Sequence, residues 1–266
     1  MKKIICFLLS LILIVGSCSK KEEAIIIPPC AVTKLMITDS FAGMENVQTY
    51  TYGYDASLRL IKSTLVSNIG GNISTSVLAY QYLNGLVVTA TVDGGSPLSW
   101  TNENGHVVKI FFISGDQNPV TSTTLLTYDG QGRVLTNNYT NDLGVGIRVS
   151  YSATYGSDGN LQKSTRTVFN GSTNTGDFTT TYAAFDGKNS PYTLLAKGIN
   201  QPYFLLSAYG EPNDLYFSKS NPVSATEGST PVIYTYEYND ASYPTKVVAK
   251  HATYTMTYLF EYQKCK

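Results

Sequence analysis

The chain has 266 residues, of which 19 are Lys or Arg and 19 are Asp or Glu, so its formal net charge is zero. Only 14% of its residues are charged, and a neutral chain of this kind offers no basic surface to a phosphate backbone. Nucleic acid is therefore excluded as a predicted partner. Tyrosine is abundant at 21 residues, and Tyr, Thr, Ser and Gly favour strands and turns over helices.

The first 17 residues have the pattern of a secretory signal peptide. Two lysines precede an apolar stretch from Ile4 to Val15, and two small residues follow it. The stretch is too short to span a bilayer, which needs about 20 apolar residues. Cys18 comes next, as it does in bacterial lipoproteins, so we predict that Cys18 is acylated and tethers a soluble domain to the membrane. The alternative is an ordinary secretory signal that is cut elsewhere, with Cys18 a bystander.

Residues 18–29 are predicted to be the acylated cysteine and a linker. The sequence Ser-Lys-Lys-Glu-Glu at residues 19–23 resembles the surface-export signal of Bacteroidetes lipoproteins, in which acidic residues closely follow the acylated cysteine. This resemblance implies a lipid anchor in the outer membrane and a domain that faces the cell exterior. The alternative is a solvated linker, since runs of charge are usually hydrated and disordered.

Residues 30–266 remain for a single all-β domain, a size that barrels and sandwiches often reach. Cys30 and Cys265 are the two cysteines left once the signal peptide and Cys18 are set aside. We predict a disulfide between them that joins the two ends of the domain, and the alternative is two free thiols. No metal site is predicted, because two cysteines without companion histidines do not make a zinc shell.

The domain contains an internal repeat of an aromatic strand, a polar turn and an apolar strand. Residues 52–60, 128–135 and 155–161 show it best, and Gly105, Gly132 and Gly159 are spaced 27 residues apart. A unit of this length holds two strands, and Asn-Gly or Asp-Gly supplies the positive φ angles of hairpin turns. We therefore predict an antiparallel meander of about eight hairpins, curled as an open sheet or closed as a barrel, with no helix after the signal peptide. A degenerate copy is expected near residues 209–214.

The Tyr-x-Tyr-Asp, Gly and Arg-Leu elements of the repeat resemble the YD repeats of bacterial surface and secreted proteins. Together with the lipoprotein start, the chain resembles a family of Bacteroidetes lipoproteins of unknown function whose domain has a porin-like β fold. The resemblance covers residues 30–266, and residues 190–230 depart from it. It implies a porin-like shape, and it supplies no catalytic residues and does not imply a pore. Strands such as residues 135–140 carry polar residues on both faces, unlike strands that face lipid.

No catalytic constellation is evident. His106 and His251 are the two histidines and lack a nucleophile motif, so both are interpreted as exposed structural residues. The acidic residues of the repeat, which are Asp55, Asp129, Asp158, Asp186 and Asp240, fall at predicted turns, where Asp bonds its own backbone. We predict no catalytic residues, no metal and no cofactor.

The predicted function is binding outside the cell. Candidate ligand-binding residues are Trp100, for which core filling is the alternative, and Tyr203, Tyr209 and Tyr216 in the segment that breaks the repeat. We predict a surface-anchored binding module for a glycan or for an envelope protein. The alternatives are an enzyme, such as a glycan hydrolase or esterase, and a purely structural envelope module.

Overall fold

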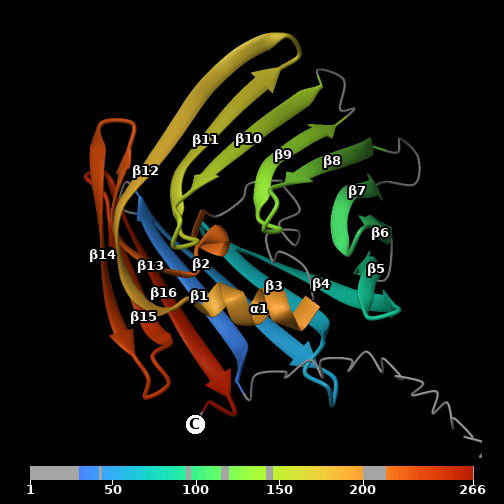
Figure 1. Ribbon diagram of the computed structural model, residues 1–266, viewed down its shortest axis with the longest axis horizontal. Helices are drawn as coiled ribbons and strands as arrows, with labels where there is room; N and C mark the ends of the chain where they lie inside the picture. Colours follow the sequence, from blue (N-terminus) through green and yellow to red (C-terminus); the bar gives the residue numbers. More distant parts are fainter. Residues whose placement is uncertain are drawn as a thin grey trace, which may run out of the picture.

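The structure is a computed structural model that describes residues 30–41, 44–93, 97–114, 120–141, 146–199 and 214–265. These residues form a closed barrel of sixteen strands in which each strand pairs with its neighbours in the chain, and β1 pairs with β16 to complete the ring (Figure 1). The strands are β1 (Ala31–Phe41), β2 (Met44–Tyr54), β3 (Leu60–Ile69), β4 (Asn72–Leu83), β5 (Leu86–Val92), β6 (Pro97–Glu103), β7 (His106–Ser114), β8 (Val120–Tyr128), β9 (Val134–Asn141), β10 (Ile147–Tyr155), β11 (Leu161–Asn170), β12 (Thr173–Asn189), β13 (Ser220–Glu227), β14 (Thr230–Tyr238), β15 (Pro244–Lys250) and β16 (Tyr254–Gln263).

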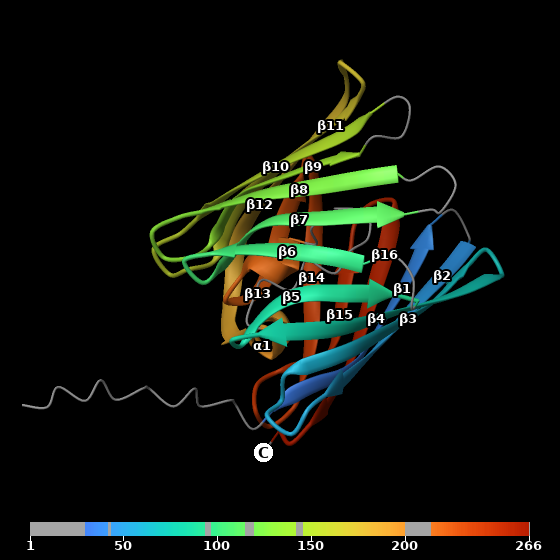
Figure 2. The same cartoon turned by 90° about the vertical axis from the view of Figure 1, so that its right-hand side faces the viewer.

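The predicted all-β meander of hairpins is confirmed, and the sheet is closed instead of open. The turns predicted from the repeat follow β2, β4, β6, β8, β10 and β14, so they gather at one end of the barrel, as Figure 2 shows for β4 through β11. We call this end the repeat rim and the other end the opposite rim. Cys30 and Cys265 are joined in a disulfide at the repeat rim, beside the start of β1 and the end of β16.

The commonest turn of the repeat rim spans five residues and is organised by its first residue. In the turn at residues 129–133, the Asp129 carboxylate accepts hydrogen bonds from the backbone N–H groups of Gln131 (2.8 Å) and Arg133 (2.9 Å). Gly132 donates its N–H to the Asp129 carbonyl and has a φ of 77°. Asp129 in turn donates its N–H to the Arg133 carbonyl, and the equivalent two backbone-to-backbone bonds close the turns at residues 55–59, 156–160 and 239–243. Asn84-Gly85 and Asn104-Gly105 form the shorter hairpin turns, with positive φ at both residues.

In most hairpins, a tyrosine near the end of the second strand donates a hydrogen bond from its hydroxyl to a backbone carbonyl of the first strand. The Tyr82 hydroxyl donates to the Leu60 carbonyl at 2.6 Å, and the Tyr155 hydroxyl donates to the Val134 carbonyl at 2.8 Å. Four further tyrosines make the same bond, namely Tyr54 to Val32, Tyr128 to Val107, Tyr236 to Pro222 and Tyr262 to Pro244. All of them except Tyr262, which lies at the end of the last strand, are aromatic residues that the repeat places before its turns.

The apolar core lies inside the barrel. Fully buried side chains stand two residues after the positive-φ position of successive turns, as Leu60, Val87, Val107, Val134 and Leu161 do. The exposed residues of the strands are mixed, with ion pairs such as Lys34–Glu261 and Lys246–Glu237 among isolated exposed apolar residues. A membrane-spanning barrel has an apolar outer band and a polar interior, whereas here the apolar core lies inside the barrel and the exposed residues are mixed. Within the described residues there is no helix of the length and hydrophobicity needed to cross a membrane.

The prediction of no helix after the signal peptide is wrong. A helix, α1 (Pro191–Ile199), and a 3-10 turn, η2 (Asp214–Phe217), lie between β12 and β13. Pro191 suits a first helical position, and the preceding Ser190 accepts hydrogen bonds from Thr193. Because α1 has only nine residues, its buried positions Tyr192, Leu194 and Leu195 are too few for a 3.6-residue period to stand out in the sequence.

The repeat of hairpins is interrupted where β12 leads into α1. The predicted turn at Asp186-Gly187 lies inside the long strand β12, where Gly187 has a φ of 71° and the pairing with β13 is irregular. Asp186 still bonds its own backbone, because it accepts the Lys188 N–H at 2.8 Å, and it also accepts hydrogen bonds from Asn221 of β13 and from the Tyr238 hydroxyl of β14. The degenerate copy expected near residues 209–214 falls almost entirely outside the described residues.

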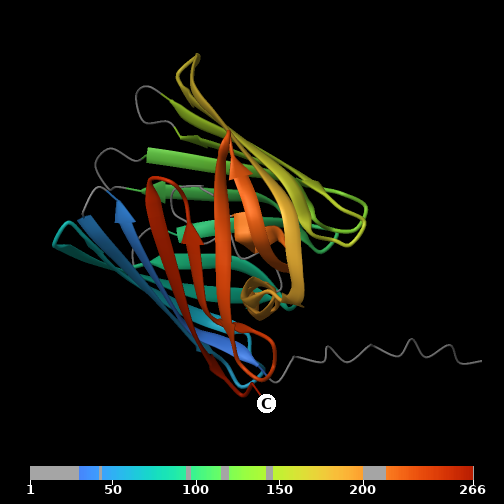
Figure 3. The same cartoon turned by 90° about the vertical axis from the view of Figure 1, so that its left-hand side faces the viewer.

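The helix α1 lies inside the barrel near the repeat rim, against the neighbouring strands β16, β1, β2 and β3 (Figure 3). At its start, the ring of Tyr192 packs edge-on against Phe260 of β16 at 5.8 Å. At its end, a Cβ atom placed on Gly198 would lie 3.2 Å from the Tyr54 ring and 3.6 Å from the Leu60 Cβ. The η2 turn extends this layer, because Phe217 stacks on Tyr151 of β10 at 5.3 Å. Through the contact of Tyr192 with Tyr216, α1 and η2 together reach from the β16–β3 wall to β10 near the repeat rim.

Candidate functional site

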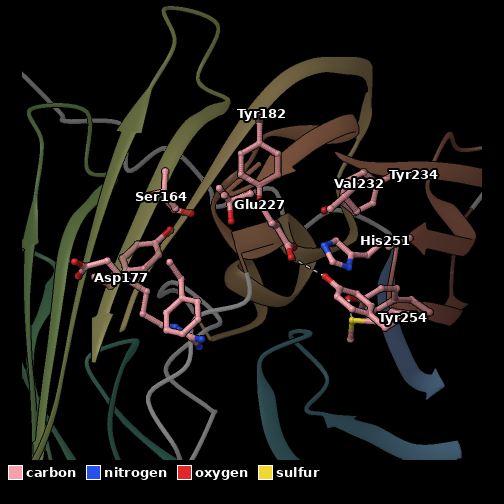
Figure 4. A pocket seen from close by; sticks show the side chains of 17 residues that line it. Ser164, Asp177, Tyr182, Glu227, Val232, Tyr234, His251 and Tyr254 are labelled. Atoms are coloured by element: carbon pink, nitrogen blue, oxygen red, sulfur yellow. Dashed lines mark hydrogen bonds between the residues drawn. The ribbon is translucent and has the colours of Figure 1, made fainter. Parts of the chain in front are cut away.

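A pocket of about 600 Å³ lies inside the barrel along β10 to β16, in the half nearer the opposite rim (Figure 4). Its outer lining includes Gly228 in the turn between β13 and β14, and His251 and Tyr254 on either side of the turn between β15 and β16. Those turns belong to the opposite rim, so the mouth of the pocket is there. We call it the lumen pocket.

Buried tyrosines form the floor of the lumen pocket. Tyr151, Tyr182, Tyr234 and Tyr258 point inward from β10, β12, β14 and β16, and each is almost fully buried. Tyr151 is backed by Phe217 of η2 through the ring stacking described above. A ligand that enters at the opposite rim therefore meets this aromatic floor before it reaches the repeat rim.

One wall of the pocket carries an exposed aromatic ring. Phe178 of β12 lies in the pocket yet is 52% exposed. The Arg166 guanidinium, opposite it on β11, lies 4.7 Å from the centre of its ring. Gly176 leaves the space that the ring occupies, because a Cβ atom there would lie 2.9 Å from Phe178 Cε2. This geometry favours a ring held in place with part of its surface open to the pocket.

The other wall carries polar groups from two neighbouring hairpin tips. The Tyr254 hydroxyl donates to Glu227 Oε2 at 2.8 Å, and the His251 ring stacks on Tyr254 at 4.5 Å. Burial and the adjacent Glu227 carboxylate raise the pKa of Tyr254 above its ordinary value, so its hydroxyl stays protonated and donates. His251 Nδ1 accepts the Thr253 backbone N–H at 3.2 Å, which leaves Nε2 to carry the proton of a neutral ring.

The arrangement suits recognition of a polar ligand with an apolar face. Glu227 supplies an acceptor and Arg166 and His251 supply donors, while Phe178 supplies an aromatic surface. Asp177 and Glu227 are the acidic residues of the lining, and their carboxylates do not face each other. Asp177 is next to Phe178 on β12 and turns its carboxylate away from the pocket, where the Asn174 amide donates to it, while Glu227 accepts from Tyr254 (Figure 4). Among the described residues no group of three or more His, Cys, Asp and Glu side chains is placed to hold a metal ion.

Two of the sequence-predicted binding residues, Trp100 and Tyr216, do not line this pocket. Trp100 is 6% exposed and lies against Tyr80 in the core, with a ring distance of 6.5 Å, so it offers no free face to a sugar. Tyr216 is half-buried on η2 and packs edge-on against Tyr192 at 4.5 Å. Tyr203 and Tyr209, like Cys18, lie outside the described residues.

Sequence reasoning missed the residues that line the pocket. His251, interpreted as an exposed structural residue, is half-buried on the pocket wall, and Phe178, Arg166 and Glu227 were not singled out. One signal was available, because Phe178, Thr180 and Tyr182 alternate along one strand and so share a face. Recognising the pocket also required knowing that β11 through β16 curve around a common interior.

No protein-family model and no curated protein matches the chain. Among solved structures, a porin-like protein from Bacteroides uniformis ATCC 8492 matches with a TM-score of 0.56 at 15% identity, covering 87% of this chain and 98% of that protein. A porin-like protein from Bacteroides vulgatus ATCC 8482 matches with a TM-score of 0.55 at 11% identity, with the same coverage. The chain has a porin-like fold. The resemblance in shape expected from the sequence is thus confirmed, and identities this low show the fold alone.

Proposed function

We propose that this porin-like barrel is a lipid-anchored outer-membrane protein that faces the cell exterior and binds a glycan in its lumen pocket. The observation that carries the proposal is the exposed Phe178 ring inside the pocket, across from Glu227 and His251. A pocket of about 600 Å³ is within the range that small-molecule sites occupy.

A sugar fits both walls of the pocket. The C–H face of a pyranose packs on an aromatic ring, and its hydroxyls both donate and accept hydrogen bonds. Glu227 and His251 together offer one acceptor and one donor on the same wall. One guanidinium, of Arg166, and one carboxylate, of Glu227, face into the pocket, so we expect little selectivity for ligand charge.

The positions of Cys30 and of the pocket mouth at opposite ends of the barrel support a pocket that opens away from the membrane. Cys30 lies at the repeat rim, and the mouth of the pocket lies at the opposite rim. A lipid on Cys18, twelve residues before Cys30, would hold the repeat rim toward the membrane and leave the mouth facing away from it. The mixed polar outer surface of the barrel suits a domain that stands in water and is held by an anchor.

The anchor is tested by Cys18→Ser. We expect the variant to lose incorporation of a fatty-acid probe and to leave the membrane fraction, while protease shaving of intact cells removes the wild-type domain. Continued lipid labelling of the variant would refute the acylation, and protection of the wild type from shaving would refute surface display.

Glycan binding is tested on an array of plant, mucin and bacterial glycans, followed by calorimetry of the hits. We expect Phe178→Ala to weaken binding by about tenfold or more, since it removes the aromatic platform. Ile233→Ala is the matched control, because Ile233 is half exposed on β14 and lies beside Val232 without lining the pocket. An equal loss of glycan affinity in both variants, or no loss in either, would contradict the proposal that the glycan binds in the lumen pocket.

A further inference from the structure

We infer that the lumen pocket receives the end of a glycan chain and not an internal segment. This inference rests on the proposed function, and it depends on how the barrel limits access to the pocket. It specifies the ligand as the terminal sugar units of an oligosaccharide or polysaccharide.

The barrel wall gives no sideways access. All sixteen strands are joined to both neighbours by ladder hydrogen bonds, including β1 to β16, which pair along ten residue positions. A chain that passed across the pocket would have to leave through this wall, and that would require a pair of strands to separate. A linear polymer can therefore only run along the barrel axis.

The axis is blocked beyond the pocket. The floor is formed by Tyr151, Tyr182, Tyr234 and Tyr258, all nearly buried. Behind the floor, η2 stacks on Tyr151 of β10 through Phe217, and Tyr216 of η2 packs on Tyr192 of α1. The helix α1 in turn lies against the neighbouring strands β16, β1, β2 and β3, so α1 and η2 together bridge two walls of the barrel. A glycan that enters at the opposite rim stops at the tyrosine floor, so the part it inserts must be a chain end.

The size of the pocket sets the length of the inserted end. A volume of about 600 Å³ is that of a site for a drug-sized ligand, which corresponds to about two or three sugar units. The polar wall lies at the mouth, where Glu227, His251 and Tyr254 sit beside the tips of two hairpins. These groups would contact the last unit to enter, while the aromatic floor contacts the terminal unit.

The experiment uses the purified full-length lipoprotein and a library of plant, mucin and bacterial oligosaccharides of about two to eight units, together with their parent polymers. Calorimetry and light scattering measure the affinity and the number of protein molecules bound per chain. We expect affinity to rise up to about three units and then to stay within about twofold, with one protein per accessible chain end at any length. Chemical capping of that end should weaken binding by more than about tenfold.

The outcomes separate this inference from the proposed function. If the number of bound protein molecules grows with polymer length, and Phe178→Ala still removes binding, glycan binding in the pocket stands and end recognition is refuted. If polymer binding survives Phe178→Ala, the glycan binds elsewhere, and both proposals fail. Absence of binding at millimolar concentration across the whole library also refutes both.

Discussion

At the residue scale, one backbone position recurs through the repeat. The residue two places before each buried apolar side chain has a positive φ at Leu58, Gly85, Gly105, Gly132, Gly159 and Ser242, with values between 59° and 86°. Glycine adopts this conformation without the steric cost that a Cβ atom brings, whereas other residues pay about 1 kcal/mol or more. Leu58 and Ser242 are the two non-glycine residues among them. In their turns the side chain of the first residue, Asp55 or Asn239, accepts a backbone N–H from the last residue, and this bond helps to hold the strained conformation.

Substitution of these glycines by Val tests their role as scaffold. Gly159→Val and Gly132→Val place a β-branched residue at φ 86° and 77°, and at Gly132 the new Cβ would also meet the His106 ring at 2.9 Å. We expect each to lower the free energy of unfolding by about 1 to 3 kcal/mol, with glycan affinity of the folded fraction unchanged. Thermal melting and calorimetry measure the two effects.

The matched control is Gly130→Val. Gly130 lies in the same turn as Gly132, has no positive φ, and a Cβ there meets nothing within 4 Å. Its melting temperature should stay close to that of the wild type. A Gly159→Val protein that keeps its stability and loses ligand would mean that the turn belongs to a binding site.

At the element scale, the strands are tied together by the tyrosine bonds at the repeat rim. The pattern was visible in the sequence as aromatic residues before each turn, and the turns it predicted after β2, β4, β6, β8, β10 and β14 are present. The tyrosine hydroxyl bond was not predictable from this pattern, because the accepting carbonyl lies 21 residues earlier for Tyr128 and Tyr155. A contact at that separation is defined only once the pairing of the strands is known.

Tyr155→Phe tests this bond. The change keeps the ring that Arg133 stacks on at 4.5 Å and removes the hydroxyl that donates to the Val134 carbonyl. We expect a loss of about 1 kcal/mol, since the carbonyl of a buried residue is left without this donor. Chemical denaturation measures it, and Thr154→Val, on the exposed neighbouring residue of β10, is the control. No difference between the two variants would mean that the hydroxyl bond contributes nothing to stability.

The site was less predictable than the fold. Hairpin turns depend on local chemistry, such as Asn-Gly pairs and the Asp129 carboxylate, so they can be recognised in a single sequence. The lumen pocket depends on strands from β10 to β16 that converge on one interior, and on α1 and η2, whose short segments carry no strong period. Trp100 was singled out by its chemistry alone, and its burial follows from the inward face of β6.

At the scale of the whole molecule, closure of the barrel determines how a ligand reaches the lumen pocket, because a continuous wall leaves the opposite rim as the entrance. The sequence left an open sheet and a closed barrel as alternatives, because local patterns do not report whether the first and last strands meet. In the structure they pair from Ala31 with Gln263 to Phe41 with Tyr254. Closure removes the two free edges that a sheet of this size would expose to other chains.

The disulfide between Cys30 and Cys265 joins β1 to β16 at the repeat rim, and its two cysteines are 235 positions apart in the sequence. For a loop of this length the chain-entropy model gives about 5 kcal/mol of stabilisation, and real bridges often give less. We expect the native protein to show no free thiol at either cysteine, and reduction to lower its melting temperature. Cys30→Ser combined with Cys265→Ser should melt at the temperature of the reduced wild type and should not respond to reductant. Quantitative alkylation of both cysteines in the native, unreduced protein would show instead that the β1–β16 pairing closes the barrel without a covalent link.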